Sequence, residues 1–181
     1  MLEVILTYKG FQPIFETLRG LQFKYNEGVY VLDEQTTNYT ATIINDTSIN
    51  QLKLQFSKEL SFEQYKHLHK IIKILVEKIQ AKVDDHQALM GYLDNGNEAY
   101  IYHGWSAWVQ FLEGAKHVSM EGQKVQVYDN QLLLGEGILV ESTKAENTND
   151  DFYITQCKLI TRNGEQTYTG DQLKIIATGE F

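Results

Sequence analysis

Histidine and aspartate side chains occur in two short clusters of the kind that can bind a metal ion. His67 and His69 are two residues apart in a segment with helical periodicity, so their side chains point roughly 200° apart and cannot share an ion. We expect His67 to face solvent and His69 to lie at the edge of the apolar face. Asp84-Asp85-His86 is interpreted as the acidic start of a helix. The sequence therefore predicts no metal site and no cofactor.

Ser106 is the one serine in a setting that suggests a nucleophile. Gly104-Trp-Ser-Ala-Trp108 matches four of the five positions of the Gly-x-Ser-x-Gly turn of α/β-hydrolases, but a tryptophan replaces the second glycine. That fold also needs an acid and then a histidine after the serine, and only Glu113 precedes the single following histidine, His117. We interpret Ser106 as the N-cap of a helix and predict no catalytic residue.

Cys157 is the single cysteine of the chain. It excludes an intrachain disulfide and fits a reducing compartment, and its place in a predicted strand favours a buried, inert thiol. The N-terminal residues show no signal peptide, and no segment is apolar enough to span a membrane. These features predict a cytoplasmic protein.

Aromatic residues are concentrated between positions 92 and 111. Six of the 21 aromatic residues and both tryptophans lie in these twenty positions. Two interpretations remain open: a core seam that joins the two halves of the chain, or a surface that contacts a partner or a flat ligand. The candidate binding residues are Tyr100, Tyr102, His103, Trp105 and Trp108.

The first half of the chain alternates between strand and helix patterns. Strands are predicted at 2–8, 22–25, 29–32, 39–44 and 51–56, and the later four form an antiparallel meander. A short helix is predicted at 11–20, with Pro13 in its first turn. The clearest helix covers about 61–82, where Ser61 and Gln64 form a capping box. We expect this long amphipathic helix to cover one face of the meander.

Residues 84–93 are predicted to form a further helix, followed by a strand at 98–102 and a short helix at 106–112 that ends at Gly114. Later segments predict strands at 123–128, 132–141, 152–161 and 166–176. Between them lie the turn Asn163-Gly164 and a polar loop at 142–151, which we expect to be mobile.

Several segments of the last third resemble a small SH3-like β-barrel of the KOW or Tudor type. They are Val125 and Val127 after Gly122, Leu134-Gly-Glu-Gly-Ile-Leu-Val140, Cys157–Ile160 and Gly170-Asp-Gln-Leu-Lys-Ile175. The resemblance implies a barrel that binds peptides or nucleic acid and does not catalyse. Unlike the versions that bind nucleic acid, this segment is acidic.

Charge is distributed unevenly along the chain. The net charge is −8, and residues 84–181 hold fifteen acidic side chains against six basic ones. Only Arg19 and Arg162 are arginines, the residue type that best recognises phosphate. Both observations argue against nucleic acid as the main ligand and favour either solubility alone or a basic partner protein.

The sequence thus predicts an α+β protein with an antiparallel meander and one long amphipathic helix at 1–115, followed by a small SH3-like barrel at 118–181. The leading hypothesis is a non-catalytic cytoplasmic adaptor or regulator, such as an immunity-type inhibitor, that binds a protein. One alternative is an enzyme or small-molecule binder with a pocket at the junction, lined by Tyr100, Tyr102, His103 and Trp105. The other is a nucleic-acid module that uses Lys66, Lys70 and Lys73.

Overall fold

Strands with alternating apolar residues form an antiparallel sheet in the first part of the chain. The computed structural model describes residues 1–34, 38–145 and 153–179, and within them this sheet has six strands in the order β2-β3-β4-β5-β1-β6. The strands are β1 (Leu2–Thr7), β2 (Lys24–Asn26), β3 (Val29–Glu34), β4 (Tyr39–Asp46), β5 (Gln51–Phe56) and β6 (Lys82–Gln87). Strands β2 to β5 pair consecutively, which confirms the predicted meander, and β1 and β6 extend it beyond β5.

Helix α2 (Phe62–Ile79) is determined by local signals that the sequence already carries. The backbone N–H of Gln64 donates to the Ser61 hydroxyl at 3.3 Å, and the Ser61 N–H donates to the Gln64 side chain at 2.8 Å. This confirms the predicted capping box. The helix ends at Gln80, which takes a left-handed conformation with φ 49°.

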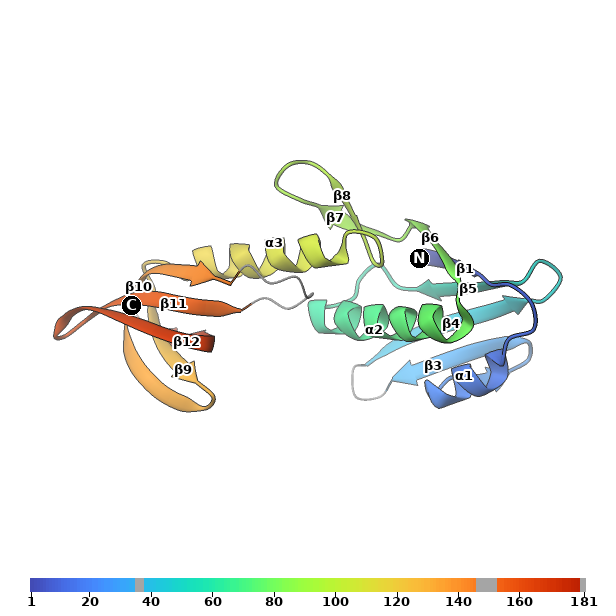
Figure 1. The fold of residues 1–181 in the computed structure, drawn as a ribbon, viewed down its shortest axis with the longest axis horizontal. Helices are drawn as coiled ribbons and strands as arrows, with labels where there is room; N and C mark the ends of the chain where they lie inside the picture. Colours follow the sequence, from blue (N-terminus) through green and yellow to red (C-terminus); the bar gives the residue numbers. More distant parts are fainter. Residues whose placement is uncertain (35–37, 146–152, 180–181) are drawn as a thin grey trace. The chain divides into compact units, whose positions relative to one another are not determined.

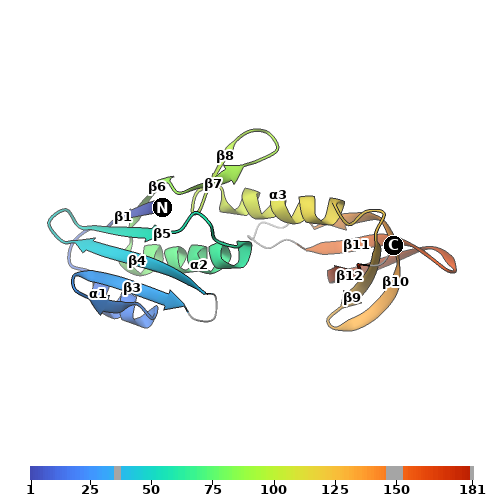
Figure 2. The same cartoon turned by 180° about the vertical axis from the view of Figure 1, so that it is seen from behind.

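The apolar face of α2 packs on the sheet. Its buried side chains at helical spacing include Tyr65, Leu68, Ile72, Leu75 and Ile79. Tyr65 meets Phe56 of β5 edge-to-face, with ring centroids 6.4 Å apart. A second, seven-residue helix, α1 (Ile14–Gly20), packs against α2. Figure 1 shows α2 lying along one face of the sheet, and Figure 2 shows the opposite face, which carries no helix.

The prediction of a helix at 84–93 is wrong. This segment forms β6 and then β7 (Leu89–Tyr92), which pairs with β8 (Glu98–Tyr100). Leu6 pairs with Val83 and Ile5 with Asp84, so β6 satisfies the backbone of β1 at an otherwise open edge. Acidic residues at a helix start stabilise it by only about 0.3–1 kcal/mol, and the pairing of a whole strand outweighs that preference.

Helix α3 (Trp105–Val118) is longer than predicted, because it continues through Gly114. A glycine inside a helix costs about 1 kcal/mol, which the burial of Trp108, Val109 and His117 offsets. The chain therefore has more than one substantial helix. The helix begins at Trp105, so Ser106 lies inside its first turn. The prediction that Ser106 is the N-cap is therefore wrong.

The last part of the chain is a closed barrel of four antiparallel strands, as far as the described residues show. The strands are β9 (Lys124–Asp129), β10 (Leu132–Lys144), β11 (Ile154–Thr161) and β12 (Gly164–Ala177), and β9 pairs with both β10 and β12. The four predicted strands are confirmed with shifted ends. Residues 146–151 of the predicted polar loop lie outside the described residues, and 142–144 belong to β10.

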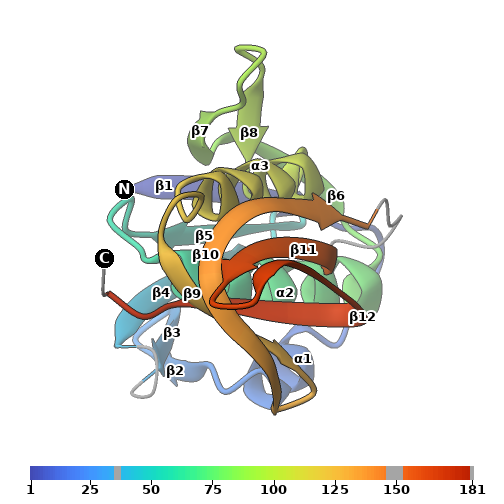
Figure 3. The ribbon, with the colours of Figure 1, turned by 90° about the vertical axis from the view of Figure 1, so that its left-hand side faces the viewer.

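Glycine permits the sharp curvature of β10, which Figure 3 shows. A Cβ atom at Gly137 would lie 2.4 Å from the carbonyl oxygen of Ile160 on the neighbouring strand. The barrel encloses its own core, made of Val125, Val127, Leu139, Ile154, Cys157, Leu159, Leu173 and Ile175. The barrel strands can thus bend tightly around an apolar centre because small residues stand at the close approaches.

The chain divides into two compact units, Met1–Trp105 and Ser106–Phe181. The expected boundary at 115–118 lies in the last turn of α3, whereas this division lies at the first residue of the helix. Together, the elements establish a mixed α+β protein. Among the described residues, no helix has both the length and the apolar character needed to cross a membrane.

Candidate functional site

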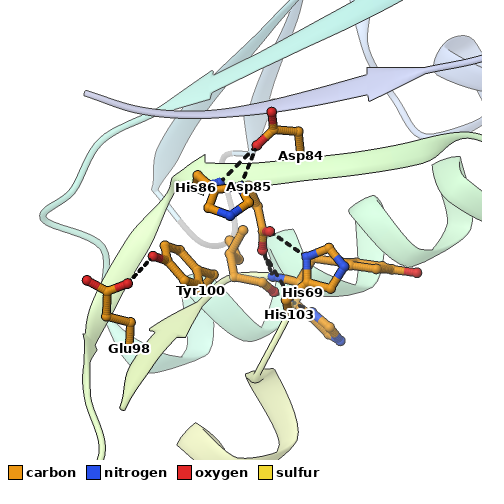
Figure 4. Close-up of polar contacts among 9 residues, drawn as sticks. His69, Asp84, Asp85, His86, Glu98, Tyr100 and His103 are labelled. Carbon is orange, nitrogen blue, oxygen red and sulfur yellow. Dashed lines mark hydrogen bonds and ion pairs between the residues drawn. The ribbon is translucent and has the colours of Figure 1, made fainter. Parts of the chain in front are cut away.

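Asp85 organises a polar cluster beside β6 in the first unit. Successive side chains of a strand point to opposite faces, so Asp85 points away from Asp84 and His86, and it is only 1 % exposed. Its Oδ2 accepts the backbone N–H of Tyr102 at 2.8 Å and of His103 at 2.9 Å. Its Oδ1 lies 2.6 Å from His103 Nδ1 (Figure 4). Three donors compensate the buried carboxylate for the water it has lost.

The carboxylate of Asp85 also determines how His103 carries its protons. An ionised carboxylate only accepts hydrogen bonds, so Nδ1 of His103 is the donor and Nε2 is the free acceptor in the neutral ring. The His103 side chain is 59 % exposed, although its partner is buried. A histidine oriented by a buried carboxylate is one component of many general bases. Here the same pair also ties residues 102–103 to β6.

A second pair, Asp84 and His86, lies on the outer face of β6. Their Oδ1 and Nδ1 atoms are 2.9 Å apart, and both side chains are exposed. The hydrogen bond to Asp84, together with its charge, raises the pKa of His86, and the same contact lowers the pKa of Asp84. The His86 ring also contacts the ring of Tyr100, whose hydroxyl donates to the carboxylate of Glu98 (Figure 4). This outer cluster therefore favours a protonated histidine.

His69 is buried and belongs to the core of the first unit. Its Nδ1 lies 2.7 Å from the carbonyl oxygen of Ile101, and its ring stacks on Trp105 at a centroid distance of 4.3 Å. His69 thus belongs to the buried face of α2, and it is more completely buried than an edge position suggests. The prediction that His67 faces solvent is wrong: the ring is half-buried, and its Nδ1 lies 2.9 Å from the Tyr39 hydroxyl.

The candidate binding residues of the aromatic band have different environments. Trp105 and Trp108 are buried, at 4 % and 8 % exposed, which matches the interpretation as core. Tyr100 and Tyr102 are half-buried, and His103 is exposed. The structure brings Tyr102 and His103 together on Asp85, a residue that sequence reasoning missed as a site residue. The sequence contains the signal in the triplet Asp84-Asp85-His86. In a helix all three side chains can be exposed, whereas in a strand Asp85 points to the face opposite to Asp84 and His86.

A groove of about 560 Å³ lies elsewhere in the first unit, between the segment that leads into α1 and the turn between β4 and β5. Its lining residues are Tyr8, Gly10, Phe11, Gln12, Pro13, Ile14, Phe15, Glu16, Tyr30, Asn45, Thr47 and Asn50. Sequence reasoning did not identify this groove. The available signal was the pair Phe11 and Phe15, which was assigned to the buried stripe of a helix.

Aromatic side chains and one acid dominate the groove. Phe11 is 98 % exposed and Phe15 is 50 % exposed, so they form the rim, whereas Tyr8 and Tyr30 are almost fully buried and lie at depth. The Tyr8 hydroxyl donates to Asn45 Oδ1 at 3.0 Å. Among these lining residues, Glu16 is the only charged one.

The hydroxyl groups of Tyr8 and Tyr30, which line the groove, have raised pKa values. Burial raises the pKa of Tyr30, and Tyr25 and Glu16 raise it further. Burial and the carboxylate of Asp46 raise the pKa of Tyr8. Burial is the largest cause of both shifts and disfavours any charge, whereas the nearby carboxylates of Glu16 and Asp46 add a negative potential that favours a cationic ligand.

The structure also describes the environment of the single cysteine. Burial raises the pKa of Cys157 to about 11, so the thiol stays protonated near neutral pH, as the predicted inert thiol requires. Within the described residues, no three His, Cys, Asp or Glu side chains are close enough together to hold a metal ion.

The lysines proposed for nucleic-acid binding, Lys66, Lys70 and Lys73, are exposed on α2. Lys70 also lines a small cavity of about 190 Å³ beside Gly20 and Gln22. Comparison of the chain with protein-family models, with curated proteins and with solved structures found no match.

Proposed function

We propose that this chain is a non-catalytic, cytoplasmic binding protein, an adaptor or a regulator of the immunity type, that recognises a basic protein partner. The observation that carries the proposal is the groove beside α1, where Phe11 is almost completely exposed at 98 %. Large aromatic side chains at protein surfaces are typical anchors of interfaces, because burying them on binding releases a large apolar area from water.

Charge supports the choice of a basic partner. The chain has a net charge of −8, and the charged residue that lines the groove is the acid Glu16. Complementary charge accelerates encounter with a partner and disfavours wrong ones. We also propose that the barrel of β9 to β12 is SH3-like; its four closed antiparallel strands are compatible with this, and such barrels mostly bind.

Capture from a lysate of the source cells tests this function. The tagged wild-type chain is compared with Phe11→Ser and with Leu132→Ser, a control that removes an apolar side chain of the second unit that is 68 % exposed. We expect one basic protein to be retained by the wild type and by Leu132→Ser and to be lost by Phe11→Ser. Retention of that protein by Phe11→Ser would exclude the groove as the interface, and capture of no protein would contradict the proposal.

A second candidate function is small-molecule binding or catalysis, and the His103–Asp85 pair is the observation that favours it. A ligand screen by thermal shift tests it with the wild type and with His103→Gln. We expect no ligand whose stabilisation depends on His103. A ligand whose shift disappears in His103→Gln would support this second function over the first.

A further inference from the structure

The groove beside α1 combines two kinds of side chain that together recognise organic cations. Four of the lining residues are aromatic, of which Phe11 and Phe15 are exposed and Tyr8 and Tyr30 almost fully buried, and Glu16 supplies a carboxylate. The negative faces of aromatic rings attract an ammonium or guanidinium group within about 6 Å, and a nearby carboxylate adds a charge pair. Glu16 distinguishes this groove from a purely apolar one, and its negative charge would repel an anionic ligand.

We infer that this groove receives the side chain of a lysine or arginine from an extended segment of the partner protein. The inference rests on the proposed function and names the part of the partner that is recognised. The alkyl stem of the incoming side chain packs against Phe11 and Phe15 at the rim. Its charged head lies between Glu16 and the rings of Tyr8 and Tyr30.

Glu16 is available for an incoming cation. It is exposed, and within the described part of the chain it forms no ion pair, although Arg19 lies one turn further along the same helix. Its negative charge reaches the depth of the groove, since it contributes to the raised pKa of Tyr30. A neutral apolar segment would cover this carboxylate without giving it a partner, which is costly, and an acidic segment would be repelled.

The surroundings of the groove reinforce this negative character. Asp46, at the end of β4, raises the pKa of Tyr8. Hydrogen bonds from Ser48 lower the pKa of Asp46 itself, so this carboxylate stays ionised at neutral pH. The charge of Lys53 also lowers that pKa, and as a cation it offsets part of the negative potential of Asp46. The neighbouring Lys9 contributes its backbone carbonyl, which accepts a hydrogen bond from Gln12.

The size of the groove suits one side chain and the adjoining backbone. Its volume of about 560 Å³ falls within the usual range of about 300–1,000 Å³ for sites that bind a small ligand. Asn45, Thr47 and Asn50 line the same groove and offer polar groups to a peptide backbone. A small free cation would fill only part of this volume.

Titration with defined probes tests the inference on the full chain. The probes are a capped hexapeptide of alternating glycine and arginine, the same peptide with lysine, the same peptide with citrulline, and tetramethylammonium chloride. Binding is followed by calorimetry and by the ring resonances of ¹³C-labelled tyrosine. We expect the arginine and lysine peptides to shift the resonances of Tyr8 and Tyr30. The neutral citrulline peptide should bind at least about threefold more weakly.

Variants assign the binding to the groove. Glu16→Gln removes the charge with little change of shape, and Phe11→Ala removes one rim aromatic that is too exposed to be needed for folding. We expect both to weaken the arginine and lysine peptides at least about threefold, and Leu132→Ser to bind them as the wild type does. Thermal unfolding of each variant verifies that the fold is retained.

The outcomes separate this inference from the proposed function. Equal binding of the arginine and citrulline peptides, or no shift with any peptide, would overturn the cation site. Tetramethylammonium binding as tightly as the peptides would overturn the choice of a protein segment. If a captured partner depends on Phe11 but is indifferent to Glu16→Gln, the proposed function stands and this inference falls. If the cationic peptides bind but no partner is captured, the cation site stands and the proposed function falls.

Discussion

Asp85 shows how one buried charge can organise a segment far from it in the sequence. Its carboxylate accepts two backbone N–H groups and a histidine from residues 102–103, seventeen and eighteen positions along the chain. A single buried charge with three donors is stable only while all three are present. The cluster therefore depends on both the charge and the shape of Asp85.

Asp85→Asn is expected to destabilise the first unit by about 1–3 kcal/mol, because one of the three donors then faces an amide N–H₂ in place of an acceptor. The free energy of unfolding in urea measures the effect. Asp84→Asn, at an exposed position on the same strand, is the control and is expected to change that free energy by at most about 0.5 kcal/mol. Equal effects of the two substitutions would contradict the role given to Asp85.

His86 is expected to titrate above its ordinary value of 6.5, because the hydrogen bond and charge of Asp84 raise its pKa. The native state then binds this proton more tightly than the unfolded chain does. The stabilisation is present below pH 6.5 and is lost as the pH rises through the raised pKa of the folded protein. For Asp84, whose pKa is lowered, it is present above the ordinary value of 3.8 and is lost as the pH falls through the lowered pKa.

A titration of the histidine ring resonances by NMR checks this prediction. We expect the midpoint of His86 to fall towards 6.5 in Asp84→Asn, because this substitution removes the charge that raises its pKa. A midpoint of His86 that does not move would show that Asp84 is not its partner in solution.

At the scale of the elements, close approach between strands decides where glycine is required. Gly137 and Gly114 are both glycines within regular elements, but only Gly137 has a neighbouring backbone against it. The first lies in β10 beside β11, and the second lies on α3 with nothing within 4 Å. The same substitution should therefore have opposite effects at the two positions.

Gly137→Ala is expected to destabilise the barrel by about 1–3 kcal/mol, because its Cβ would lie 2.4 Å from the carbonyl oxygen of Ile160. Gly114→Ala is expected to stabilise the chain by about 0.5–1 kcal/mol, since alanine favours the helix. Urea unfolding of both variants measures the difference. A neutral Gly137→Ala would mean that β10 and β11 separate easily at this point.

At the scale of the whole molecule, the two compact units have separate cores. The first core lies between the sheet and α2, and the second is enclosed by β9 to β12. Mutations in one core leave the contacts of the other intact, so their effects on stability are expected to be local.

Hydrogen exchange of Gly137→Ala tests this independence. We expect faster exchange of the amides of β9 to β12 and unchanged exchange in β4, β5 and α2. Faster exchange throughout the chain would show that the two units unfold as one cooperative body and would contradict the expected independence.

The sequence alone determined the elements whose signals are local. The helix at 62–79 follows from a capping box and a continuous apolar face, and the four strands after residue 123 follow from alternation and turns. The signals for these elements come from residues a few positions apart, so they can be recognised in the sequence before the distant pairing of the strands is known.

The tertiary structure alone decided the elements and sites that need distant partners. Residues 82–87 became a strand because the open edge of β1 lies beside them, and Asp85 became a site because residues 102–103 meet it. The groove joins residues 8–16 with Tyr30 and the turn at 45–50. Sequence periodicity does not contain these proximities, because pairing and burial are settled by contacts between segments that are far apart in the chain.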